Sequence, residues 1–266
     1  MGLATLLAAA VLAVSPAAYL ESNQQRDGGF AEPGSSSSPG LTAWALLGLR
    51  AAGRPSAAAY DYLVAHEPDL RTATDIELAV LAEGATGGVS EPLYEKLVAL
   101  GRPDGRIGPA INSTAWGVLA LAQTGRVPRP RVSYLLRQQQ HSGGWGWIAG
   151  ARTDSNDTAA VIQALRAEGI RGRPITRGLA YLRRLRNPDG GFELTSGRGS
   201  DAQSTAWAIQ AFVSAGAGPP AGAFRYLASL RQPDGSYRYS RRYAATPVWV
   251  TSQVLPALLR KPFPLR

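Results

Sequence analysis

Cysteine is absent from the 266-residue sequence, and histidine is nearly so, with only His66 and His141. Without cysteine the chain has no disulfide framework, no thiolate nucleophile and no cysteine-ligated metal. Both histidines fall at predicted outer-helix or turn positions, so the sequence offers few candidates for the histidine of a Ser-His-Asp catalytic triad. No phosphate-binding or dinucleotide-binding glycine motif is present either. The sequence therefore predicts no metal site and no cofactor.

Lysine is scarce as well. Lys96 and Lys261 are the only two, so the net charge of +9 comes almost wholly from arginine. The arginines are scattered, and no nucleic-acid-binding motif accompanies them. We interpret the charge as a coat on outer helices, and we predict no nucleic-acid partner. An anionic membrane surface or a protein partner is left open as an alternative.

A membrane-spanning apolar run is also missing. The apolar stretch at residues 3–14 is too short to cross a bilayer comfortably, and small residues follow it at positions 15–18. This pattern resembles the apolar part of a signal peptide, although only two residues precede it and neither is basic. We therefore expect a secreted or envelope-associated protein, with the cytoplasm as the alternative. Residues 1–15 are assigned to this segment and residues 16–266 to one domain.

What the sequence does contain is a repeated helix hairpin, seen most cleanly at residues 181–216. Proline and paired glycines at positions 188–191 cannot continue a helix, and Asp201 or Ser204 can cap the next one. In four first helices a tyrosine-leucine pair is followed eight residues after the leucine by a glycine, at Gly28, Gly143, Gly190 and Gly235. Four second helices begin with threonine-alanine, at Thr42, Thr114, Thr158 and Thr205. Weaker copies bring each set to six.

A period in the forties with two helices per unit indicates a helical repeat array. Open arrays need polar end units, but the first and last copies here keep their aromatic-leucine signature, which favours closure into a ring. The second helices are rich in alanine and glycine and so suit a crowded inner ring. We predict an all-α protein, an α6/α6 toroid with repeats at about 16–53, 54–87, 88–125, 126–169, 170–216 and 217–266.

The motif Arg177-Gly178-x2-Tyr181-Leu182-x3-Arg186-x3-Gly190-x-Phe192 resembles the QW repeat of squalene-hopene and oxidosqualene cyclases. The copy that begins near Tyr134 keeps the usual glutamine and tryptophan, as Gln139 and Trp145. The resemblance covers nearly the whole chain and implies the toroid of terpenoid cyclases and protein prenyltransferases. The same toroid occurs in non-catalytic cobalamin carriers and complement thioester domains. We interpret the repeat motif itself as a structural staple.

Within this resemblance, residues 154–159 (DSNDTA) are similar to the DxDDTA motif of class II terpene cyclases. In that family the central acid protonates an alkene or an epoxide, but here that position is Asn156. Asp154 or Asp157 would have to replace it, because paired carboxylates can share a proton. The alternative is that both aspartates cap the helix, as Asp201 and Gln203 in the matching positions of the next unit suggest.

Two further family comparisons limit the chemistry. Triterpene cyclases place their active site between two helical domains, and this chain supplies one. Protein prenyltransferases bind zinc through an aspartate, a cysteine and a histidine, so the missing cysteine excludes that site.

Trp44, Trp116 and Trp207 occupy one equivalent position near the start of three second helices, and Trp249 lies near it in the last. We expect these indoles at one mouth of the toroid, either as ligand contacts or as core. The polar rim is predicted to contain Asp75, Glu77, Asn112, Asp154, Asp157, Asp201 and Gln203.

Three functional hypotheses follow. The first is a non-catalytic, exported protein that binds an apolar or corrinoid-like small molecule at the toroid mouth. The second is a class II terpenoid cyclase that starts the cyclisation of an isoprenoid with a proton from Asp157. The third is a purely structural toroid that presents its basic outer helices to a protein partner.

Overall fold

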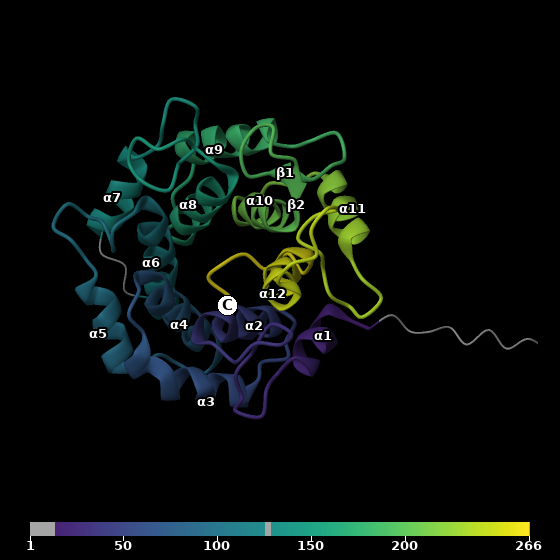
Figure 1. Cartoon of the computed structure of the whole chain (residues 1–266). Helices are drawn as coiled ribbons and strands as arrows, with labels where there is room; N and C mark the ends of the chain where they lie inside the picture. The colour runs from purple at the N-terminus through teal and green to yellow at the C-terminus, as the bar shows by residue number, and fades with distance from the viewer. Residues whose placement is uncertain (1–13, 126–128, 266) are drawn as a thin grey trace, which may run out of the picture.

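A computed structural model describes residues 14–125 and 129–265 of the chain, and it confirms the α6/α6 toroid (Figure 1). The outer ring consists of α1 (Pro16–Ser22), α3 (Ala57–His66), α5 (Glu91–Ala99), α7 (Arg129–Arg137), α9 (Arg173–Arg184) and α11 (Ala221–Leu230). The inner ring consists of α2 (Pro39–Ala51), α4 (Ala73–Thr86), α6 (Ile111–Thr124), α8 (Ser155–Ala167), α10 (Ala202–Ser214) and α12 (Pro247–Leu258). A short 3-10 turn, η1 (Glu67–Asp69), and a small hairpin of β1 (Phe192–Glu193) and β2 (Ser200–Asp201) lie in the connections.

The signal-like segment predicted at residues 1–15 lies almost wholly outside the described residues. Within the described ranges, no helix combines the length and the apolar character needed to cross a membrane.

The inner ring closes on itself. Each inner helix packs on the next one along the chain, and α12 packs on α2 to complete the circle. Hydrogen bonds from the starts of the inner helices to the loops of neighbouring units also close the ring. The first-turn N–H groups of α6, α8 and α10 donate to carbonyls of the following unit's loop, at Trp147, Leu194 and Tyr239. At α12 the acceptor is the carboxylate of Glu32, which lies in the first unit of the chain and receives N–H groups from Val248 and Trp249.

The glycine of each first-helix signature is a contact point with the next outer helix. Gly190 has a φ of 92°, and a Cβ built on it would lie 2.5 Å from the carbonyl oxygen of Gly222 in α11. Gly235 in the last unit has the equivalent contact with Val14 and Ser15 at the start of α1. A side chain would therefore separate the turn from its neighbour at every such joint, including the one that closes the ring.

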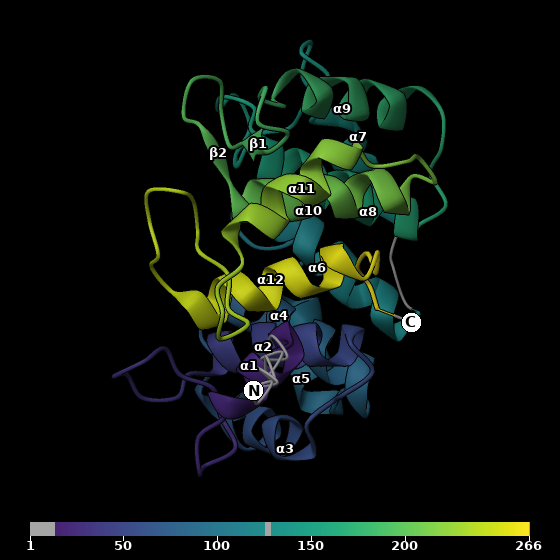
Figure 2. The ribbon, with the colours of Figure 1, turned by 90° about the vertical axis from the view of Figure 1, so that its right-hand side faces the viewer.

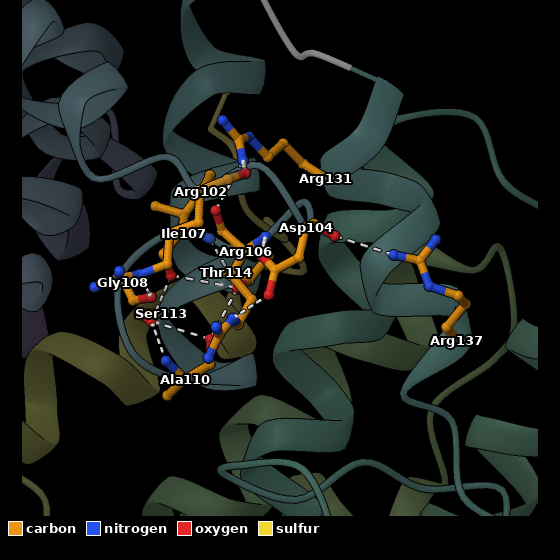
Figure 3. Close-up of polar contacts among 10 residues, drawn as sticks. All are labelled: Arg102, Asp104, Arg106, Ile107, Gly108, Ala110, Ser113, Thr114, Arg131 and Arg137. Atoms are coloured by element: carbon orange, nitrogen blue, oxygen red, sulfur yellow. Dashed lines mark hydrogen bonds and ion pairs between the residues drawn. The ribbon is translucent and has the colours of Figure 1, made fainter.

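The threonine of each second-helix signature holds the turn from the inner side. Its hydroxyl accepts the backbone N–H of the residue that closes the turn, as Thr205 does from Phe192 at 2.9 Å. The same bond joins Thr42 to Phe30, Thr114 to Ile107, Thr158 to Trp145 and Thr251 to Tyr237. Figure 3 shows the Thr114 copy, where Ser113 also bonds Ile107 and Ala110. The two sequence signatures thus form one hydrogen-bonded joint.

Several arginines bind the turns from the outer side. In Figure 3, Arg131 of α7 donates to the carbonyls of Arg102 and Arg106, and Arg137 donates to the carbonyl of Asp104. Arg177 of α9 bonds the next turn in the same way, at Gln140 and His141. The arginine content predicted to be a surface coat is therefore partly structural, because these guanidinium groups tie successive repeats together.

The threonine joint can be tested at Thr205, which is fully buried, as is Phe192. The Thr205→Val variant keeps the shape of the side chain but leaves the Phe192 N–H without its acceptor. We expect the free energy of unfolding in urea to fall by about 1–3 kcal/mol, the cost of an unsatisfied buried donor. The control is Thr176→Val, whose hydroxyl bonds exposed backbone carbonyls within α9. Equal losses of unfolding free energy in the two variants would show that the threonine joint does not contribute to stability.

Candidate functional site

Four of the sequence-predicted acidic residues, Asp75, Asp154, Asp157 and Asp201, lie at the mouth of the toroid where the inner helices begin. Figure 2 shows the loops before α2, α10 and α12 projecting from this face, while the C-terminal end of the chain lies on the opposite side. α8 begins here because Asp154, in extended conformation, accepts the N–H of Asp157 at 2.8 Å as an N-cap. The capping interpretation is therefore confirmed for Asp154.

Asp157 has a different partner. It is 5% exposed, and its Oδ1 accepts a hydrogen bond from Asn112 Nδ2 of α6 at 2.6 Å. Asp157 is not a second N-cap: it lies in the first turn, where its charge complements the helix dipole, and its carboxylate joins two neighbouring inner helices. Asn156, which lies between the two aspartates in the sequence, is partly buried. Its amide oxygen accepts a hydrogen bond from the Ser155 hydroxyl at 3.2 Å.

The carboxyl group of Asp154 has a raised pKa beside Asp157. Burial, followed by the hydrogen bond and the negative charge of Asp157, raises the pKa of Asp154 to about 8. Two adjacent carboxylates in a poorly solvated site cannot both ionise at low cost, so the proton stays on the pair at neutral pH. This is the property that a general acid needs.

Asp201 provides a comparison within the same molecule. It caps α10 as Asp154 caps α8, and it accepts from the backbone N–H and the hydroxyl of Ser204 at 2.7 and 2.8 Å. Burial raises the pKa of Asp201 to about 6, with the hydrogen bonds from Ser204 acting in the opposite direction. The Asp154 site therefore differs from the Asp201 site by its second carboxylate, that of Asp157. Gln203, also predicted at the rim, is partly buried in the first turn of α10.

Three of the four predicted tryptophans meet in the middle of the ring. The indole centroids of Trp44, Trp116 and Trp207 lie 5.1–6.2 Å apart. Each is between 5% and 8% exposed, and Trp207 Nε1 donates to Gln253 Oε1 at 2.9 Å. Trp249 is placed elsewhere. It is partly buried in the first turn of α12, where its backbone N–H donates to the Glu32 carboxylate.

The fourth ring of the cluster is Phe263, from the segment that follows α12. Its centroid lies 5.9 Å from that of Trp116 and 6.2 Å from that of Trp44. Figure 1 shows this segment running from α12 into the middle of the ring. Two inner-helix amides hold it: Gln163 Oε1 accepts the Phe263 N–H at 2.9 Å, and Gln210 Nε2 donates to the Lys261 carbonyl at 3.4 Å.

Sequence reasoning missed this segment, although a signal was present. Gln163 and Gln210 stand at the same place in two alanine-rich inner helices, five residues after Thr158 and Thr205. A pair of buried amides at equivalent positions needs polar partners, and the chain supplies them from its own backbone.

The acid pair lies close to the aromatic cluster. Asn112 is four residues before Trp116 in α6, and Asp157 is three residues before Ala160, the α8 residue at the tryptophan position. Four residues of helix rise by about 6 Å, so Asn112, the hydrogen-bond partner of Asp157, lies about one helical turn from Trp116 along α6.

Glu77 does not join this site, contrary to its predicted place at the rim. It is 1% exposed in α4, and among the described residues neither of its carboxyl oxygens has a hydrogen-bond partner. Burial raises its pKa well above the usual range, so it is neutral. Asp75 lies at the helix start and accepts from the Thr72 hydroxyl at 2.6 Å.

No family model and no curated protein matches this sequence. Several solved structures are similar to this chain. A protein from Actinoplanes has a TM-score of 0.70 at 19% identity, over 92% of this chain and 97% of that one. The type II terpene cyclase MstE from Scytonema has a TM-score of 0.68 at 18% identity, over 92% and 95%. Variants of that cyclase were solved with geranylgeranyl dihydroxybenzoate as substrate and merosterolic acid A as product.

A third match is protein geranylgeranyltransferase-I from Candida albicans, complexed with GGPP, with a TM-score of 0.62 at 12% identity over 83% of each chain. The Scytonema cyclase is covered almost completely, so one toroid of this size makes up that enzyme's chain. The expectation that a cyclase needs a second helical domain is therefore too strict. The chain has the toroid fold that terpene cyclases share with protein prenyltransferases.

Proposed function

We propose that this protein is a class II terpenoid cyclase that binds an isoprenoid chain in the toroid and starts its cyclisation with a proton from the Asp154–Asp157 pair. The observation that carries the proposal is the buried contact of Asp157 with Asn112 of α6, on the helix that also supplies Trp116, together with the raised pKa of Asp154 beside it. The fold shared with the Scytonema type II terpene cyclase supports the same class of reaction.

The proton donor in this proposal is Asp154. Its carboxyl would transfer the proton to a terminal alkene carbon or an epoxide oxygen, and the substrate would become a carbocation. The indole faces of Trp44, Trp116 and Trp207 are suited to stabilise that charge by cation–π interaction. A carboxyl with a pKa of about 8 is a weak acid, so the more basic epoxide is the better substrate.

Substrate binding requires a change in the C-terminal segment. Phe263 occupies the space among the indoles, and its own exposure is 3%. An isoprenoid chain would make the same apolar contacts, so it would compete with Phe263 for the cluster. Beyond its backbone bonds to the end of α12, the segment is held across the ring by Gln163, which accepts from Phe263, and by Gln210, which donates to Lys261.

A second candidate is a non-catalytic protein that binds an isoprenoid or another apolar molecule. Asn156 favours it, because an amide has no acidic proton at the position of the family's central acid. The two candidates differ in one outcome: both bind an isoprenoid, and only the cyclase converts it.

The acid is tested with oxidosqualene and geranylgeranyl dihydroxybenzoate as substrates, with products detected by mass spectrometry. We expect a cyclised product, and a loss of at least ~100-fold in rate for Asp154→Asn, because general acid catalysis contributes about 10²–10⁴. Asp201→Asn is the matched control, since it changes the same capping position of the next inner helix. Binding of either compound without any product would favour the non-catalytic candidate.

The same assay gives a pH dependence. Asp154 is active when protonated and its pKa is raised to about 8, so the rate should be full at neutral pH and fall as the pH rises above about 8. A rate that instead falls as the pH drops from 8 to 6 would contradict the assignment of Asp154 as the acid.

The role of Phe263 is tested by the Phe263→Ala variant. We expect its affinity for farnesol, followed by tryptophan fluorescence, to rise by about 10-fold, because the competing ring is gone and the indoles are free to bind. Leu259→Ala is the control, since Leu259 is 42% exposed on the same segment. If both variants bind farnesol as weakly as the wild type and are equally well folded, the centre of the toroid is permanent core.

A further inference from the structure

A cleft on the loop-bearing face carries chemistry that the proposed cyclase reaction does not use. It lies between the loop before α10 and the loop before α12 and has a volume of about 520 Å³. Three arginines, Arg198, Arg241 and Arg242, line it together with three tyrosines, Tyr226, Tyr239 and Tyr243. A cleft of this size accommodates a small organic molecule.

Arg241 and Arg242 are available to a ligand, whereas the Arg198 side chain bonds Tyr239. All three are exposed, and neither of the two ion pairs in the described residues involves them. The two aspartates in the cleft are already engaged: Asp189 accepts from Gly191 and Ser200, and Asp201 accepts from Ser204. Three guanidinium groups outnumber two carboxylates in the lining, so the cleft has an excess of positive charge and offers donors to an anion.

Tyr243 adds flat apolar surface beside that charge. Tyr243 is 63% exposed, and the guanidinium carbon of Arg241 lies 5.9 Å from the ring centre of Tyr226. A ring-bearing ligand can stack on such faces while its charged group reaches the arginines.

Both walls are fixed in place. Glu193 accepts the N–H groups of Gly197 and Gly199, and Tyr226 donates its hydroxyl proton to the Ser200 carbonyl. On the other side, the Tyr239 carbonyl accepts the N–H of Ala202, and Ser240 accepts those of Arg242 and Tyr243. The arginines thus stand on ordered loops, which lowers the entropic cost of binding.

We propose that this cleft is a binding site for a small ring-bearing anion, with a carboxylate or phosphate group held by Arg241 and Arg242 and the ring against Tyr243. The site lies outside the aromatic cluster and does not depend on the proposed cyclase activity.

The proposal is tested by isothermal titration calorimetry of the whole protein with benzoate and phenyl phosphate, and with benzyl alcohol and inorganic phosphate as probes of the ring and the charge alone. We expect at least one of the two ring-bearing anions to bind saturably with a dissociation constant of about 1 mM or lower, and at least ~10-fold more tightly than either single probe. The tighter of the two identifies the anionic group.

The variants locate the site. Arg241→Gln with Arg242→Gln should weaken that binding at least ~10-fold, and Tyr243→Ser should weaken it while leaving inorganic phosphate unaffected. The matched control is Arg26→Gln with Arg173→Gln, which removes two exposed charges outside the cleft. Saturable binding of neither anion, or equal losses in the control, would overturn the proposal.

Discussion

The structure depends on one repeated contact, in which a glycine turn packs against the backbone of the next outer helix while a buried threonine holds its closing N–H. The glycine allows the backbone approach, since a Cβ at Gly28 would lie 2.4 Å from the Ala58 carbonyl oxygen. The threonine satisfies a donor that is shielded from water. Because Gly235 makes this contact with Ser15, the repeats form a ring and not an open solenoid.

Closure determines where chemistry can occur. All six inner helices begin at the same mouth, so their capping residues and first-turn side chains converge there. At α8 this convergence places Asp157 beside both Asp154 and Asn112, and a proton is retained that an isolated surface carboxyl would lose. At α10 the same capping position has serine as its neighbour, and the pKa of Asp201 is raised only to about 6. One substitution in a repeated motif therefore distinguishes a candidate acid from an ordinary cap.

The repeat spacing was sufficient to predict the fold, because each joint is a local pattern of aromatic, glycine and threonine residues. The capping role of Asp154 and the meeting of Trp44, Trp116 and Trp207 also follow from equivalent positions. Contacts between distant segments were not predictable in this way. The insertion of Phe263, the bond between Asn112 and Asp157 and the burial of Glu77 depend on which side chains face each other across the ring, and no spacing within one repeat encodes that.

The central claim is that the Asp154–Asp157 pair holds a proton at neutral pH. It is tested most directly by NMR titration of the aspartate carboxyl carbons in the wild type, with Asp154→Asn used to assign the signal. We expect an apparent pKa of about 8 for the group whose signal disappears in the variant. Titration of that group near the ordinary aspartate value of about 4 would contradict it and leave Asp154 as a helix cap alone.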